Sequence, residues 1–208
     1  MKDTYNERLK KRTALRQLTV AARRRRQAGF SLIDVMMWGG IVLIGLVVIA
    51  AGFLAARSKM NSVNETRELP TVISGIQATY NSQSNYAGLT LDTVARGNIW
   101  PAQETTVPTS GSATVNDRWG GPVTLTPATI NTTNDIARLV YSNVPQTECN
   151  NIIQTVASSL RRVYVDNTNS GTAGGGTQVK ADGQSLNINT LATACSADQN
   201  SVTYDIPH

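Results

Sequence analysis

A strongly basic block borders an uncharged apolar segment near the start of the chain. Arginine occupies residues 23–26, and residues 35–56 contain no Asp, Glu, Lys or Arg. A helix rises 1.5 Å per residue, so about 20 apolar residues cross the hydrocarbon core of a membrane. The sequence therefore predicts a membrane-spanning helix, and the residues that follow it must fold on a single side of that membrane.

The net charge changes sign along the chain. Residues 1–29 carry ten basic and two acidic residues, a net charge of +8, whereas the remainder carries nine basic and twelve acidic residues, a net charge of −3. A basic block beside an apolar span holds its flank in the cytoplasm. Nucleic-acid binding is the alternative for a basic chain, but it needs a basic, aromatic-bearing surface that the residues after 29 do not offer. We expect a membrane as partner, and no nucleic acid.

A cleaved secretory signal is a second interpretation of this N-terminus. Its apolar core spans about 7 to 15 residues and ends at a cleavage site. Here the apolar run continues to Ala56 and leads directly into Arg57, Ser58 and Lys59. The sequence favours an uncleaved anchor, which places the rest of the chain in a periplasmic or extracellular space.

The two cysteines, Cys149 and Cys195, both lie in the exported part. In an oxidising compartment such a pair predicts a disulfide. His208 is the only histidine, which counts against a zinc site, and a Ser-His-Asp triad would have to recruit this last residue. We expect no metal, no cofactor and no enzymatic activity.

Apolar periodicity predicts one helix over about residues 31–83, with a bend or a lost hydrogen bond at Pro70. Past the span, an apolar stripe that includes Met60 and Val63 is expected to face a partner. Glu65 and Glu68 are expected on the opposite, solvated face.

The later sequence alternates short helices and strands. A helix with Thr147 as N-cap is expected over residues 147–160, and a shorter one over 91–95. Residues 167–176 are predicted to form a flexible Gly-rich loop. Strands are expected at residues 123–126, 138–144, 163–165 and 201–206. The fold class is α+β, with the sheet packed on the exposed half of the first helix.

Gly29 is followed by Phe30, by Asp34 as the fifth residue after the glycine, and by a long apolar helix. This pattern resembles the processing site of type IV prepilins. The resemblance implies a prepilin peptidase that cuts after Gly29 and methylates the new N-terminus, Phe30. The long leader, a cysteine near the start of a helix and a second cysteine close to the C-terminus resemble the type IVb branch, most like the major prepilin of thin conjugative pili.

The resemblance also implies a division of the chain. Residues 1–29 are the leader that is removed, and residues 30–56 are the transmembrane and assembly helix. Residues 57–84 are the amphipathic half of the same helix, and residues 85–208 are a globular head with a disulfide-bounded region at 149–195. The whole is expected to have the ladle fold of type IV pilins. The turn at residues 116–122 is similar to a Trp-Gly turn that precedes a sheet strand in pilins.

Asp34 departs from the family, which usually has glutamate at this position. The resemblance implies that Asp34 pairs with the amino terminus of a neighbouring Phe30 and sets the register between subunits. The alternative is a hydrated carboxylate at the depth of the lipid headgroups.

Four glycines interrupt the span: Gly39, Gly40, Gly45 and Gly52. They are expected to let helices approach closely and to permit local unwinding during assembly. The alternative is the ordinary composition of a membrane helix.

The function implied is that of a major prepilin that polymerises into an extracellular type IVb pilus for conjugative contact, adhesion or aggregation. Before assembly it would cross the bacterial inner membrane once, with the leader cytoplasmic and the head periplasmic. The implied partners are copies of itself, the prepilin peptidase, the inner-membrane assembly machinery and minor pilins. A minor pilin or type II secretion pseudopilin is the alternative, followed by a membrane-anchored periplasmic binding protein or enzyme.

Overall fold

The computed structural model describes residues 31–208, apart from eight side chains of the first helix. These belong to Leu32, Asp34, Leu54, Ala55, Arg57, Ser58, Lys59 and Ser62. The chain divides into two compact units, Met1–Leu54 and Ala55–His208. Each is described by itself below, the second as the C-terminal unit.

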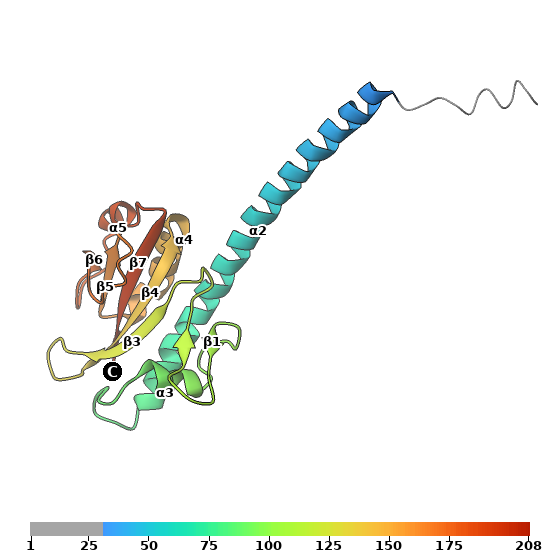
Figure 1. Ribbon diagram of the computed structural model, residues 1–208. Helices are drawn as coiled ribbons and strands as arrows, with labels where there is room; N and C mark the ends of the chain where they lie inside the picture. Colours follow the sequence, from blue (N-terminus) through green and yellow to red (C-terminus); the bar gives the residue numbers. More distant parts are fainter. Residues whose placement is uncertain (1–30) are drawn as a thin grey trace, which may run out of the picture. The chain divides into compact units, whose positions relative to one another are not determined.

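Helix α2 extends over Leu32–Tyr80 and contributes to both units. Ser31 starts it: the Ser31 hydroxyl accepts a hydrogen bond from the Ile33 N–H at 3.3 Å, as a capping serine does. The helix continues through Pro70, whose ring removes one backbone donor without ending the helix. The predicted helix is confirmed, three residues shorter at its C-terminal end (Figure 1).

Five antiparallel strands form the sheet of the C-terminal unit, in the order β3-β4-β7-β5-β6 (Figure 1). Their bounds are Val123–Ala128, Ile136–Pro145, Gln199–Pro207, Arg162–Asp166 and Thr177–Lys180, respectively. The last strand in the sequence, β7, is therefore the central one. A separate two-stranded ribbon pairs β1 (Thr105–Thr106) with β2 (Thr114–Val115). Four of these strands were predicted, whereas β1, β2 and β6 were not.

Three short α-helices complete this unit. They are α3 (Leu91–Arg96), α4 (Gln146–Val156, continued by a 3-10 turn at Ala157–Ser159) and α5 (Ile188–Ala194). The prediction that Thr147 caps α4 is wrong. Strand β4 passes straight into the helix, so the cap position falls on Pro145, whose ring has no hydrogen-bonding group. Helix α5 was not predicted.

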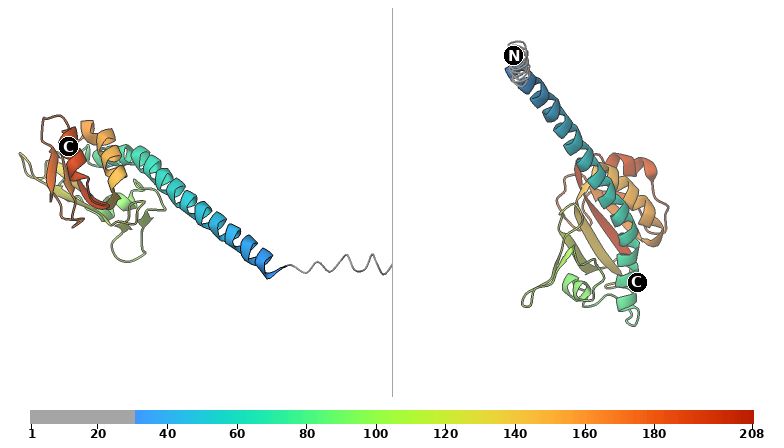
Figure 2. Two further views of the ribbon diagram at one scale, coloured as in Figure 1. Left: turned by 90° about the horizontal axis from the view of Figure 1, so that it is seen from above. Right: turned by 90° about the vertical axis from the view of Figure 1, so that its right-hand side faces the viewer.

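The core lies between the C-terminal half of α2 and the sheet. The right-hand view of Figure 2 shows this half of the helix in front of the strands. Its buried side chains follow the helical period and join those of β3, β4 and β7 in one apolar cluster: Leu69, Val72, Ile73, Ile76 and Tyr80. The α+β class, with the helix packed on an antiparallel sheet, is confirmed.

Strand β7 is buried on both faces. Val202, Tyr204 and Ile206 face the apolar core, and polar side chains alternate with them. Residues 171–174 lie over the polar side: the Gly171 and Gly174 N–H groups donate to the hydroxyls of Ser201 and Thr203 at 3.1 and 3.0 Å. The Gly-rich segment predicted to be flexible is therefore bonded to the central strand.

The turn before β3 is held by one carboxylate. Asp117 Oδ1 accepts hydrogen bonds from the N–H groups of Trp119 and Gly121, at 2.9 and 2.8 Å. A Cβ on Gly121 would lie 1.9 Å from the Ser142 carbonyl oxygen, so the turn can approach β4 only with glycine there. This turn also presents Arg118 to α2.

The C-terminal residues are bonded to the end of α2 and to the segment that follows it. The Pro207 carbonyl accepts hydrogen bonds from Gln77 Nε2 at 3.0 Å and from the Tyr86 hydroxyl at 2.9 Å. The His208 ring contacts the Tyr80 carbonyl through Nε2 at 3.1 Å. The end of the central strand is thus fixed to the last turns of the long helix.

Candidate assembly site

Within residues 31–54, the large apolar side chains that the structure describes on α2 are not covered by other described residues. Among residues 31–208, one helix segment, Val35–Phe53, is long and apolar enough to cross a membrane, with a mean hydropathy of 2.4. The large apolar side chains described in it are all exposed, from Val42 at 55% to Ile44 at 69% and Met36 at 72%. Such a surface must be covered by lipid or by other helices.

The residues predicted to act at the N-terminus lie at or beyond the edge of the described chain. Gly29 and Phe30 lie outside the described residues. The backbone of Asp34 belongs to the first turn of α2, and its side chain is not among those described. The processing site and the proposed pairing of Asp34 therefore stay predictions.

The four glycines of this segment leave the helix surface open. An added Cβ at Gly39, Gly40, Gly45 or Gly52 would meet no atom within 4 Å among the described residues. Thus no contact among the described residues requires glycine at these four positions. Close approach of a second helix remains the physical reason for small residues here.

Past the span, the structure overturns the predicted exposure of Glu65, whereas the partner expected for the stripe of Met60 and Val63 stays a prediction. Met60 and Val63 are 66% and 50% exposed, so their stripe does not contact the sheet. Glu65, predicted to be solvated, is 1% exposed and lies on the buried face with Leu69. The sequence did contain a sign that Glu65 is buried, which is the spacing of the buried residues of α2. Steps of three or four residues back from Ile76 lead through Leu69 to Glu65.

Glu65 belongs to a cluster of charges that sequence reasoning missed. With Glu68 of α2 and Glu104 of the segment before β1, it forms what we call the three-glutamate cluster, in which one oxygen of each residue lies within 4.8 Å of the others. Arg118 is the cation that faces them. Its Nε lies 3.0 Å from Glu104 Oε1 and 3.9 Å from Glu65 Oε2, and its guanidinium pairs with Glu68.

Burial makes ionisation of these carboxyls unfavourable. It raises the pKa of Glu65 to about 7, and the charges of Asp117 and Glu68 add to this effect. Burial and the charge of Glu65 raise the pKa of Glu104 to about 8. Burial also raises the pKa of Asp117 to about 7, against the hydrogen bonds from its own turn. The site holds more carboxyl groups than one guanidinium can balance.

These pKa values predict that the C-terminal unit loses stability as the pH rises. The folded state binds protons more tightly than the unfolded chain, so the stabilisation is complete below the ordinary carboxyl pKa and is lost on passing through 7 to 8. Urea unfolding of the full chain in detergent, with a chelator present, should show a free energy of unfolding lower by on the order of 2 kcal/mol at alkaline than at mildly acidic pH.

The variant Glu65→Gln removes one of these ionising groups, so its free energy of unfolding should change less with pH than that of the wild type. Glu148→Gln is the matched control, because Glu148 is also a buried glutamate, at 5% exposure, but lies on α4. A wild-type profile that stays level across neutral pH would contradict the prediction. Asp135 and Asp166, with pKa values lowered to about 2, remain ionised throughout this range.

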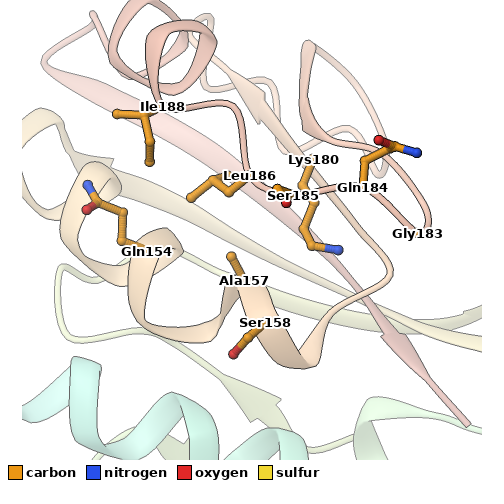
Figure 3. A pocket seen from close by; sticks show the side chains of 9 residues that line it. All are labelled: Gln154, Ala157, Ser158, Lys180, Gly183, Gln184, Ser185, Leu186 and Ile188. Atoms are coloured by element: carbon orange, nitrogen blue, oxygen red, sulfur yellow. The ribbon is translucent and has the colours of Figure 1, made fainter.

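The C-terminal unit also contains the disulfide and a surface cavity. Cys149 of α4 is bonded to Cys195 at the end of α5, with their Cα atoms 5.9 Å apart. A cavity of about 600 Å³ lies between the end of α4 and residues 180–188 (Figure 3). Its lining combines amide, hydroxyl and aliphatic groups with the side chain of Lys180, and Gln154, Ser158 and Leu186 are among the other labelled side chains.

Comparison with known proteins agrees with this architecture. The family model described as PilS N terminal matches residues 59–206. The crystal structure of a type IVb pilin from Salmonella typhi is similar, with a TM-score of 0.55 and 18% sequence identity, over 70% of this chain and 99% of that one. TcpA, a type IV pilin from Vibrio cholerae El Tor biotype, gives a TM-score of 0.47 at 16% identity, over 70% and 98% of the two chains. Among curated proteins, none matches by sequence.

Proposed function

The chain belongs to the PilS family of type IVb pilins, and from that premise we propose that it is the major subunit of a type IVb pilus. A pilin is a structural subunit of a filament. The finer parts of the proposal are that this pilin is the main component, that it is matured after Gly29, and that its filament serves conjugative contact, adhesion or aggregation.

The observation that supports assembly most strongly is the uncovered apolar segment of α2. Its described large side chains are exposed all round the helix, a pattern that suits lipid at first and the helices of other subunits afterwards. The exposed Met60 and Val63 extend apolar surface beyond the span. Contacts that repeat from one copy to the next without closing generate an open helical filament.

Maturation would convert a membrane protein into a subunit. We infer that the prepilin peptidase removes residues 1–29 on the cytoplasmic side and methylates Phe30. The basic leader supports this orientation, because positive charge stays in the cytoplasm. Inner-membrane assembly machinery would then transfer the chain into the pilus, with minor pilins as further partners.

Mass spectrometry of filaments sheared from cells tests this proposal. The expected result is that this chain is their main component and begins with N-methyl-Phe30. A strain without the prepilin peptidase is the control, and there the chain should stay intact in the membrane. Filaments in which this chain is a trace component would make it a minor pilin, and intact membrane-bound chains in both strains would overturn the proposal.

A further inference from the structure

We propose that the cavity between the end of α4 and residues 180–188 binds a sugar that carries a carboxylate, such as a uronic acid. Its volume of about 600 Å³ falls in the range of small-molecule sites, about 300 to 1,000 Å³. Its lining offers one cation, several amides and hydroxyls, and an aliphatic wall, and each of these matches one part of such a ligand (Figure 3). Binding here would involve the C-terminal unit alone, whether or not the chain assembles into a pilus.

Lys180 supplies the positive charge of the cavity. It is 9% exposed, and its Nζ donates hydrogen bonds to the carbonyls of Leu160 and Arg161 at 2.8 and 3.3 Å. An ammonium group has three donors, so one remains for a ligand. Among the residues that the structure describes, no carboxylate forms an ion pair with Lys180, and the nearby Asp182 is paired with Arg161 instead.

This buried ammonium therefore lacks a negative partner. Carbonyl oxygens solvate an ammonium group but do not neutralise it, and a buried charge without a counter-ion is costly. Lys180 lines the cavity, and in Figure 3 its ammonium end lies between Ala157 and Gly183. A carboxylate that entered the cavity would supply the missing charge and accept the remaining hydrogen bond.

The amides and hydroxyls around the cavity are not engaged elsewhere. Amide and hydroxyl groups can both donate and accept hydrogen bonds, as the hydroxyls of a sugar do. Four lining side chains of this kind make no hydrogen bond within the described part of the chain: Gln154, Ser158, Gln184 and Ser185. They come from both sides of the cavity, so a ligand that bears several hydroxyls can contact both at once.

An aliphatic wall completes the lining. Ala157, Leu186 and Ile188 form it, and Ile188 is 53% exposed although it is a large apolar residue. A sugar ring presents C–H groups on its faces and hydroxyls at its edge. Such a ring can cover Ile188 with a face while its edge reaches the amides and hydroxyls.

An extended peptide with an acidic side chain is the alternative occupant, and the edge of β6 argues against it. A peptide that joins a sheet needs free backbone N–H and C=O groups at the edge strand. The Val179 carbonyl of β6 already accepts a hydrogen bond from the Asn187 N–H at 3.0 Å. The segment that contributes to the cavity thus covers this edge, which leaves side chains rather than backbone to hold a ligand.

NMR titration of the isotope-labelled full chain in detergent micelles tests the site. Methyl β-D-glucuronide at millimolar concentrations should shift the backbone amide signals of residues 157–158 and 180–188. Methyl β-D-glucoside has a hydroxymethyl group in place of the carboxylate and should bind about tenfold more weakly, because it cannot pair with Lys180. A uronic acid oligosaccharide that binds more tightly than the single sugar would identify a surface polysaccharide as the source of the ligand, whereas equal affinity would identify the single sugar.

Variants of the lining assign the binding to particular groups. Lys180→Met should lower the affinity for the glucuronide to that for the glucoside. Gln154→Ala changes an exposed side chain, so it should leave the fold intact and weaken the glucuronide about threefold. Gln146→Ala is the matched control, because Gln146 is an exposed glutamine of the same helix outside the cavity, and it should bind as the wild type does.

Three results would overturn the proposal. Equal affinity for the glucuronide and the glucoside would show that the charge of Lys180 does not select the ligand. Binding that is unchanged in both Lys180→Met and Gln154→Ala, or that shifts only amides outside residues 157–158 and 180–188, would place the sugar elsewhere. An acidic peptide that shifts these amides when the glucuronide does not would make the cavity a protein-docking site.

Discussion

Filaments are expected to disappear when Asp34 is replaced by alanine, while the cut after Gly29 continues. A carboxylate in an apolar membrane helix costs about 2.5 to 3.5 kcal/mol at the centre of the bilayer and less near its edge, so it is retained where it has a partner or a function. In the proposed filament that partner is the amino terminus of a neighbouring Phe30. The attraction between these two charges is far stronger in an apolar core than in water.

Two further variants separate charge from size at this position. Asp34→Glu keeps the charge and should still form filaments, whereas Asp34→Asn keeps the size and should not. Electron microscopy of the cells, with an immunoblot that distinguishes cut from uncut chain, reports assembly and cleavage independently. Normal pili from Asp34→Ala would show that this carboxylate only rests in hydrated headgroups.

Loss of the disulfide is expected to have the second largest effect, on the stability of the C-terminal unit. Cys149 and Cys195 are separated by 46 residues in sequence, and both are 0% exposed. Removing a cross-link over a loop of this length costs roughly 4 kcal/mol through the entropy of the unfolded chain. The double variant Cys149→Ser, Cys195→Ser should therefore unfold at a markedly lower urea concentration and yield few filaments.

A reducing agent provides the matched comparison for this experiment. It should shift the unfolding midpoint of the wild-type chain toward that of the double variant and leave the variant itself unchanged. Equal midpoints for the oxidised wild type and the double variant would contradict the expected role of the bond.

Elements with strong apolar periodicity were predictable from the sequence. The long helix and strands β3, β4, β5 and β7 have runs of alternating or helically spaced apolar residues, and each was found within a few residues of its expected position. The ribbon of β1 and β2 and the edge strand β6 were missed. Each has only two to four residues, too few for a period to show, and pairing with a neighbour determines their conformation.

The ionic cluster was missed because charge was taken as a sign of exposure. Glu65 continues the buried face of α2, but its burial depends on Arg118, which is 53 positions away and is presented by a turn. The Gly-rich segment was misjudged for a similar reason. Its glycine N–H groups donate to Ser201 and Thr203, so its order comes from a strand far along the sequence.

The position of β7 determines when the sheet of the C-terminal unit can form. The last residues of the sequence form the middle of the sheet, between β4 and β5, each of which pairs with β7 and not with the other. If the C-terminal unit crosses a membrane with its N-terminal end first, the sheet cannot close until export has finished. The nascent unit would then expose β4 and β5 as unpaired edges throughout translocation. A chaperone could bind these edges, or a protease could cleave the chain, during that time. A premature stop codon that removes β7 would delete the strand to which both β4 and β5 are hydrogen-bonded.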